Sequence, residues 1–423
     1  MKKFTIFFTA FFLAFIGTMA GCEFEVDPGV DANVELVYTL VGEGEQAYYI
    51  VGNVASVADA DLGGKDVDDL DYEQKAAIFG SYGGSLATVT VPAEHEGLPV
   101  KGVGAYAFYL CSAVQINLPE TIEFIAEEAF RNCPDLESVV VGSREKGSSL
   151  KRIGDAAFRA CRSLTTVYLW GETVPQVQTF ASQTTNSPFY STSYPAVVVP
   201  NEQRAQYVSD VVWSVYSDYV VSQSSVYTNG QIIENGKLVK YTGHEVVVTI
   251  TDVVKIVGQY AFKGNELKQV NFPYGVEEIG RQAFYGCKQL VTYTFKDGSC
   301  LTAIGNNAFE GCVSLKTAVI PQSVTVVKDK AFAGCTSMDT IFIQSTTIGF
   351  IYTNVFGGCT VLENVYFAGD ADQFAAIDIR KGNEPLTEAN FIWNYTDAPI
   401  LPEQTVSPDS STSSEAPSES LAE

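Results

Sequence analysis

The chain repeats one short pattern of apolar and polar positions. Each copy has apolar residues at the first, fourth and sixth positions of one segment and then a second apolar pair. Ala-Phe follows in nearly every copy, usually with Cys three residues after the Phe. Apolar residues two apart lie on one face of an extended strand, so each copy predicts one short strand with a buried side. The eight copies contain Phe108, Phe130, Phe158, Phe262, Phe284, Phe309, Phe332 and Phe356.

These copies form two groups, three in the first and five in the second, with neighbours 22 to 28 residues apart. Self-similarity at this period is typical of a solenoid, in which each repeat buries its apolar face against the next. We therefore predict a repeat solenoid of mainly short parallel β-strands with turns and short helical segments. The two groups predict two stacked arrays with caps.

The same landmarks predict the organisation of the chain. The charged insertion at 142–149 explains the longest spacing, and the Pro, Ser and Glu composition after residue 398 is typical of disorder. The predicted segments are a signal peptide (1–21), an acidic leader and N-terminal cap (22–85), a first array (86–170), its closing segment (171–224), a second array (225–361), a C-terminal cap (362–398) and a disordered tail (399–423).

The Cys column belongs to the predicted interior. It comprises Cys111, Cys133, Cys161, Cys287, Cys312, Cys335 and Cys359. Stacked rungs about 4.8 Å apart would bring such residues into disulfide range. Seven cysteines cannot all pair with one another, however, and a free Cys packs as a small hydrophobe. We favour a ladder of buried thiols, with disulfides as the alternative.

The N-terminus predicts export. Lys2 and Lys3 precede an apolar run from Phe4 to Ile16, which is too short to span a membrane and typical of a secretory signal. Met19-Ala20-Gly21-Cys22 resembles a bacterial lipobox, although Leu is more usual at the first position. This resemblance implies that Cys22 carries lipid and tethers the protein to a membrane at the cell surface. An ordinary signal peptide with a chance Cys is the alternative.

The repeat unit resembles the BspA-like leucine-rich repeats of bacterial surface proteins. Stretches such as LPETIEFIAEEAFRNCPDLESVVV and FPYGVEEIGRQAFYGCKQLVTYTF carry the resemblance, which covers most of residues 85–398. It implies a solenoid of the leucine-rich-repeat type at the cell surface. It also implies a non-enzymatic module for protein binding or adhesion, whose partner would be an extracellular or host protein or another cell surface.

Charge and motifs narrow the chemistry. With 50 acidic and 26 basic residues, the net charge of −24 disfavours nucleic acid as a partner. We find no nucleophile elbow or phosphate loop and therefore predict no catalytic residues and no cofactor. His95 and His244 precede the first Ala-Phe of each array, a matched placement that could serve a metal site or a catalytic base, but no Cys-x-x-Cys or spaced His-Glu partner accompanies either. The acidic segment from Asp59 to Asp71 begins like a calcium loop but has Leu70 at the twelfth position, so we predict no metal site.

The residues between the core columns predict the binding surface. In stacked strands they form outward ladders, polar along one row and partly aromatic along the next. Exposed Thr and aromatic residues also favour strands for structural reasons alone. The candidate binding face consists of Thr166, Tyr168, Thr292, Thr317, Thr340, Phe342, Asn364 and Tyr366. We expect this face to bind protein; capture or display of glycan for a partner enzyme is the alternative.

Overall fold

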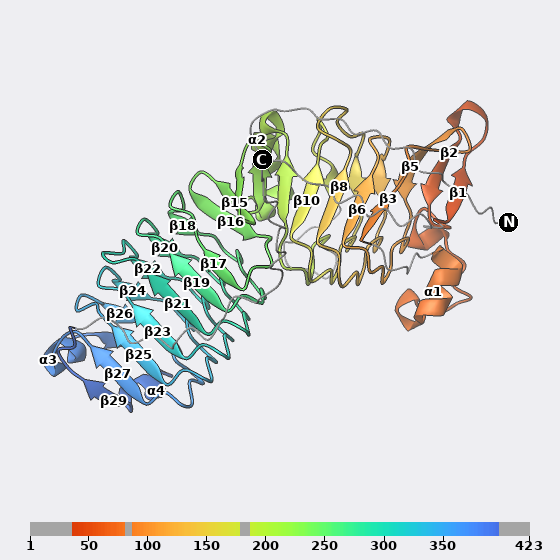
Figure 1. Ribbon diagram of the computed structural model, residues 1–423. Coiled ribbons are helices and arrows are strands. Elements are labelled where there is room, and N and C mark those ends of the chain that lie inside the picture. Colours follow the sequence, from red (N-terminus) through yellow and green to blue (C-terminus); the bar gives the residue numbers. More distant parts are fainter. Residues whose placement is uncertain (1–35, 81–86, 178–186, 397–423) are drawn as a thin grey trace, which may run out of the picture.

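The computed structural model describes residues 36–80, 87–177 and 187–396. The predicted signal peptide, Cys22 and the predicted tail lie outside these ranges. The described chain winds into a solenoid of parallel strands, which confirms the predicted fold class (Figure 1). Each complete rung contributes a strand of about four residues to one sheet and a strand of two residues to another.

The first unit contains both sheets and a hairpin at its N-terminal end. The short-strand sheet has the order β1 (Tyr38–Val41), β2 (Tyr48–Val51), β5 (Leu98–Val103), β7 (Phe124–Ile125), β9 (Arg152–Ile153) and β11 (Gln176–Val177), with β4 (Glu94–His95) paired to β5. The long-strand sheet has the order β13 (Val220–Ser222), β12 (Ala196–Val199), β10 (Thr166–Leu169), β8 (Ser138–Val141), β6 (Gln115–Leu118) and β3 (Thr88–Thr90). The helical elements are η1 (Gly44–Gln46), η2 (Val57–Asp59), η3 (Val67–Asp69), α1 (Tyr72–Phe79), α2 (Asn201–Ser209) and η4 (Trp213–Tyr216).

The second unit repeats this plan, except that it begins with three antiparallel strands in place of a two-stranded hairpin. Its short-strand sheet has the order β14 (Val226–Thr228), β15 (Gln231–Glu234), β16 (Lys237–Tyr241), β18 (Ile256–Val257), β20 (Glu278–Ile279), β22 (Ala303–Ile304), β24 (Val326–Val327), β26 (Phe350–Ile351) and β28 (Asp378–Ile379). The long strands are β17 (Val247–Thr249), β19 (Gln269–Phe272) and β21 (Thr292–Phe295), and then β23 (Thr317–Ile320), β25 (Thr340–Ile343), β27 (Asn364–Phe367) and β29 (Asn390–Ile392). Helices α3 (Ala371–Ala375) and α4 (Glu384–Thr387) close the unit.

A side chain divides the long-strand sheet of the second unit. Between β21 and β23, the Tyr293 hydroxyl donates to the Val319 carbonyl at 3.1 Å and accepts from the Val319 amide at 3.0 Å. It thereby occupies backbone groups that a neighbouring strand would otherwise pair with. The sheet is consequently split into three strands and four.

The predicted interior columns are confirmed. All eight repeat Phe rings are buried, and consecutive rings stack nearly parallel, as for Phe309 between Phe284 at 5.0 Å and Phe332 at 5.2 Å. The Phe amide of one rung donates to the carbonyl of the residue before the Phe in the next rung, for example Phe284 to Ala308. Side-chain stacking and backbone pairing therefore follow the same axis.

The Cys column has a bonding role besides packing. Six of its seven thiols lie within 2.8 to 3.3 Å of the carbonyl oxygen of the Phe one rung earlier, as Cys161 does with Phe130 at 2.8 Å. A thiol is a weak donor, and in five of the six cases it adds a second hydrogen bond to a Phe carbonyl that already accepts from the backbone amide three residues later, as Phe284 does from Cys287. The eight cysteines within the described ranges are free thiols, and the seven in the column are buried. Burial raises the pKa of the Cys287 thiol to about 12.

The turns of each rung contain left-handed backbone at two fixed positions. One lies two residues before the Phe, at Tyr106, Glu128, Ala156, Tyr260, Gln282, Asn307, Lys330 and Asn354. The other lies two residues after it, at Leu110, Asn132, Ala160, Gly264, Gly286, Gly311, Gly334 and Gly358. A residue with a side chain costs about 1–2 kcal/mol in this conformation. The second unit avoids that cost at the second position by using glycine throughout.

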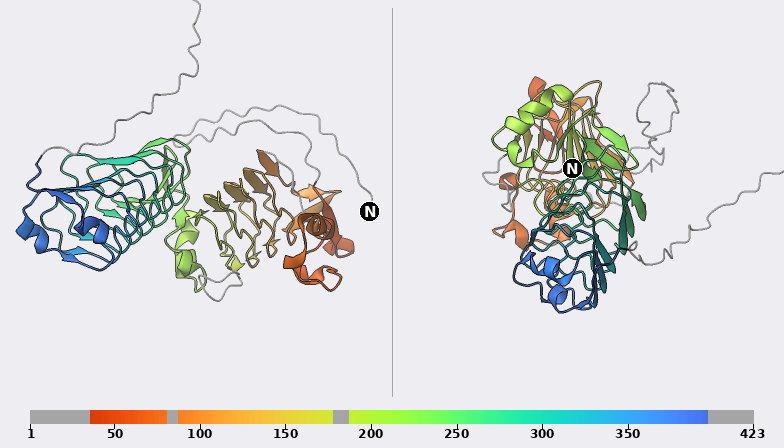
Figure 2. Two further views of the ribbon diagram at one scale, coloured as in Figure 1. Left: turned by 90° about the horizontal axis from the view of Figure 1, so that it is seen from below. Right: turned by 90° about the vertical axis from the view of Figure 1, so that its left-hand side faces the viewer.

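The two units lie end to end and at an angle to each other (Figures 1 and 2). At the junction, Ile232 of β15 and Val239 of β16 pack with Val198 of β12 and Val221 of β13. The Tyr194 and Tyr260 rings stack at 4.4 Å, and Lys237 forms an ion pair with Asp218 at 2.6 Å. The β15 and β16 hairpin thus packs against the end of the first unit.

Candidate functional site

The register of the predicted binding face is confirmed where the strands pair. Thr317 pairs with Thr340, and Thr340 pairs with Asn364. Phe342 pairs with Tyr366 in the neighbouring row. The candidate residues therefore do form rows along the sheet.

The exposure of this face was predicted wrongly. Thr166, Thr292, Thr317 and Phe342 are buried, and Thr340, Asn364, Tyr168 and Tyr366 are only partly exposed. Neighbours in the row enclose the threonines, as Ser138 and Ala196 do on either side of Thr166.

Segments distant in sequence cover the aromatic part of the same face. The Tyr395 ring, just after β29, lies 5.4 Å from the Phe342 ring and 4.8 Å from the Tyr366 ring. Tyr168 packs in the junction cluster that contains Trp170 and the hairpin residues Ile232 and Val239. These contacts leave little of the predicted aromatic ladder available to a partner.

A different row of side chains faces outward on the short-strand sheet of the second unit, with three of its six positions exposed and three partly exposed. The register aligns the outward positions of six consecutive strands, which are Ile256, Glu278, Ala303, Val326, Phe350 and Asp378. Four of the six are apolar, and Ile256 and Phe350 are 36% and 44% exposed. The Tyr352 ring lies 6.0 Å from that of Phe350 and is also exposed. We call these six positions the outer row.

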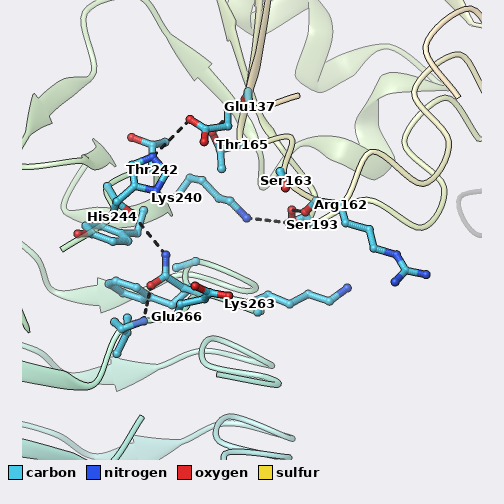
Figure 3. Close-up of a pocket in the computed structure, with 17 residues that line it drawn as sticks. Glu137, Arg162, Ser163, Thr165, Ser193, Lys240, Thr242, His244, Lys263 and Glu266 are labelled. Atoms are coloured by element: carbon cyan, nitrogen blue, oxygen red, sulfur yellow. Dashed lines mark hydrogen bonds and ion pairs between the residues drawn. The ribbon is translucent and has the colours of Figure 1, made fainter. Parts of the chain in front are cut away.

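The junction between the units contains a pocket of about 360 Å³ (Figure 3). The first unit supplies Glu137, Arg162, Ser163, Thr165 and Ser193, from the loops around its last rungs. The second unit supplies the end of β16, the loop to β17 and the turn from Ala261 to Leu267. The pocket therefore exists only because the two units meet.

Lys240 is buried in the wall of this pocket. The Tyr241 amide donates to the Ala261 carbonyl, and the Tyr241 ring stacks on Phe262 at 5.0 Å, so Lys240-Tyr241 stands where other rungs have Ala-Phe. Lys240 is 3% exposed, and its ammonium group donates to the Ser193 carbonyl at 2.8 Å. Burial, with a smaller effect of Lys263, lowers the pKa of Lys240 from 10.5 to about 7.

The two histidines lie in different surroundings. His244 lines the pocket, and its Nε2 lies 3.4 Å from a Glu137 carboxylate oxygen. His95 stacks on Tyr38 at 4.1 Å beside the N-terminal hairpin. In the acidic segment, Asp66 and Asp71 accept hydrogen bonds from nearby backbone amides. Within the described ranges, no group of three or more His, Cys, Asp or Glu side chains is placed to hold a metal ion.

Sequence reasoning did not find the pocket. Lys240 and Lys263 belong to no recognised motif, and the sequence suggests His244 only as a metal ligand or a catalytic base. A signal was nevertheless present, because Lys240-Tyr241 occupies the Ala-Phe columns one rung before Ala261-Phe262. A lysine in a column of small apolar residues is unusual, because charged side chains are seldom buried in a protein interior.

Comparison with known proteins gives the family and the fold. The family model of the BspA type leucine rich repeat region matches in six copies, over residues 81–202 and 248–376, together more than half of the chain. A comparison with curated proteins gave no match.

Three solved structures are similar to this chain over most of its length. A leucine rich cell surface protein from Faecalibacterium prausnitzii is 21% identical, with 82% of this chain and 97% of that chain covered and a TM-score of 0.40. A leucine-rich repeat protein from Eubacterium ventriosum is 19% identical, with 83% and 92% covered and a TM-score of 0.45. The pneumococcal vaccine antigen PcpA is 14% identical, with 85% and 95% covered and a TM-score of 0.40.

Proposed function

Because the chain belongs to the BspA-type leucine-rich repeat family, we propose that it is a non-enzymatic binding and adhesion module of a bacterial cell surface. Its partner in this proposal is an extracellular or host protein, and lipid on Cys22 holds it at the membrane. Within the part of the chain that the structure describes, no helix has the length and apolar character needed to cross a bilayer.

The outer row carries the proposal of protein binding. Adjacent strands lie about 4.8 Å apart, so six strands extend the row over roughly 25 Å. Apolar side chains along it, with the aromatic rings of Phe350 and Tyr352 near one end, match the anchors found at protein interfaces. The regular backbone beneath them holds these positions rigid, which lowers the entropy lost on binding.

The test is capture of surface-labelled proteins by the immobilised chain. Replacing Ile256 and Phe350 together by Ser removes the two most exposed anchors of the row without touching an interior column. Val211, which is 88% exposed between α2 and η4, provides a matched control as Val211→Ser. We expect the double variant to lose most of the captured protein and the control to retain it.

Two results would contradict protein binding by the outer row. The first is equal capture by the double variant and the control. The second is binding to arrayed glycans with no captured protein, which would favour glycan capture instead. Lipid attachment has a separate test: a fatty acid carrying an alkyne should label the full chain in bacteria, and Cys22→Ser should abolish the label.

A further inference from the structure

The junction pocket contains three cationic side chains that lack an ion-pair partner among the described residues. Lys240, Lys263 and Arg162 all contribute to its lining, and none of the three forms an ion pair with another described residue. The whole chain has a net charge of −24. The carboxylates of Glu137 and Glu266 also line the pocket, so three cations against two carboxylates give it a small positive excess in an otherwise acidic protein.

The Lys240 ammonium has donor capacity left for a ligand. It has three N–H donors, and the contacts of the described chain are the Ser193 carbonyl at 2.8 Å and, more weakly, the Tyr260 carbonyl at 3.4 Å. A small apolar side chain would fill this column at no desolvation cost, as Ala does in the next rung. Burying a lysine without a counter-charge is unfavourable unless something else compensates.

Lys263 is held beside Lys240 by aromatic rings. Its ammonium lies 5.1 Å from the centre of the Tyr194 ring and 5.0 Å from that of the Tyr260 ring, from opposite sides of the junction. Such cation–π contacts position the charge without neutralising it. Figure 3 shows Lys240 and Lys263 extending in the same direction across the pocket wall.

Three hydroxyl groups of the lining already use their own protons in hydrogen bonds to backbone carbonyls. The Ser163 hydroxyl donates to the Pro134 carbonyl at 2.6 Å, that of Thr165 to the Glu137 carbonyl at 3.1 Å, and that of Thr242 to the Gly230 carbonyl at 3.2 Å. Their oxygens retain lone pairs and act as acceptors. A ligand that complements this wall carries hydroxyl donors in addition to an anionic group.

We infer that the junction pocket binds a monosaccharide-sized acidic sugar of the hexuronic acid class, whose carboxylate contacts Lys240 and Lys263. Its hydroxyls donate to the oxygens of Ser163, Thr165 and Thr242. A volume of about 360 Å³ lies at the lower end of small-ligand pockets, which fits one sugar unit. This site is independent of the outer row and goes beyond the proposed protein binding.

Calorimetry on the full chain with Cys22→Ser tests the ligand class with three probes. D-glucuronate carries both chemical features, acetate has only the carboxylate, and D-glucose has only the hydroxyls. We expect D-glucuronate to bind at least tenfold more tightly than either of the others. Equal affinity for acetate, or no measurable binding of D-glucuronate, would overturn the inference.

Two variants locate the ligand. Lys240→Met keeps the length of the side chain and removes its charge, and we expect at least a tenfold loss of D-glucuronate affinity. Lys316→Met removes an exposed lysine outside the pocket lining and should bind as the unsubstituted chain does. Thermal melts of both variants show that they are folded. Unchanged affinity in Lys240→Met would place the ligand elsewhere and refute the site.

Proton uptake gives a further readout. Since the folded protein holds the pKa of Lys240 near 7, a bound carboxylate should favour its charged form and draw a proton from the buffer. Affinity should then fall as pH rises from 7 to 9, approaching tenfold per pH unit, and this dependence should vanish in Lys240→Met. A dependence that persists in the variant would assign it to another group. The other charged or titratable groups around Lys240 are Lys263, Arg162, His244, Glu137, Glu266, Cys287, Tyr241 and Tyr260.

Discussion

Lys240→Met should make the protein more stable at neutral and acidic pH. The folded state lowers the pKa of this lysine from 10.5 to about 7, so folding penalises its charged form. Below pH 7 this penalty is fully present, and it disappears as pH rises toward 10.5, where the lysine is neutral in both states. The stability of the unsubstituted chain should therefore rise with pH across this window.

The magnitude follows from the pKa values. At 1.36 kcal/mol per pH unit, the penalty on folding is about 5 kcal/mol at pH 6 and about 1.4 kcal/mol at pH 9.5. Methionine also leaves the Ser193 and Tyr260 carbonyls without the ammonium donor, at a cost of about 1–3 kcal/mol that does not depend on pH. We expect a net stabilisation of about 2–4 kcal/mol at pH 6, which is lost or slightly reversed at pH 9.5.

Chemical denaturation at the two pH values measures this effect. The difference between variant and unsubstituted chain cancels the titration of other tyrosines and lysines that both share. Lys316→Met, at an exposed position, should show no comparable difference. A Lys240→Met effect that is the same at pH 6 and pH 9.5 would refute the argument, because only the ionisation of Lys240 makes it depend on pH.

Three further predictions concern the rungs. Asn383→Ala should destabilise the second unit by about 2–4 kcal/mol, because this buried side-chain amide accepts a hydrogen bond from the Phe356 backbone amide and donates to two carbonyls. Asn390→Ala, at an exposed position, should be nearly neutral. Hydrogen exchange within 340–392 measures both variants. Gly311→Ala should cost about 1 kcal/mol in thermal unfolding, because its φ of 75° is left-handed although the added methyl meets no atom closer than 3.8 Å. Gly349→Ala, with open space and no positive φ, is its control. In a Cys22→Ser chain, Cys300 should react first with an aromatic disulfide reagent, and the buried column should react only on unfolding.

The interior of the fold could be predicted because it repeats. Phe, Ala and Cys recur at fixed offsets, and the structure places these columns in the core. Two rungs lack the Ala-Phe pair: the sequence predicts the one at Lys240-Tyr241 as the start of the second array but does not predict the one at Pro188-Phe189. Pro188-Phe189 continues the first array, with Phe189 stacked on Phe158 at 5.5 Å, and Lys240-Tyr241 begins the second. Their packing role follows from backbone pairing, which a repeated dipeptide does not reveal.

The binding face could not be predicted in the same way. Alternation identifies which side of a strand a residue occupies, but it does not identify what packs on that side. Tyr395 covers Phe342 from 53 positions further along the chain, and the β15 and β16 hairpin covers Tyr168 from the next unit. Both are non-periodic segments, so their contacts are absent from the repeat pattern. The outer row belongs to strands of only two residues, too short to show alternation.

The cap of the second unit links its fold to the pocket. An array that begins inside a chain must cover its first rung. The three antiparallel strands β14, β15 and β16 do so, while their outer side packs on β12 and β13 of the first unit. The Tyr194–Tyr260 stack and the Arg204–Glu234 ion pair at 3.1 Å add contacts between the same units. Because apolar, aromatic and ionic contacts all fix the junction, both pocket walls are in place before a ligand arrives. Binding there then requires no closure of one unit on the other, and it leaves the outer row free for a protein partner.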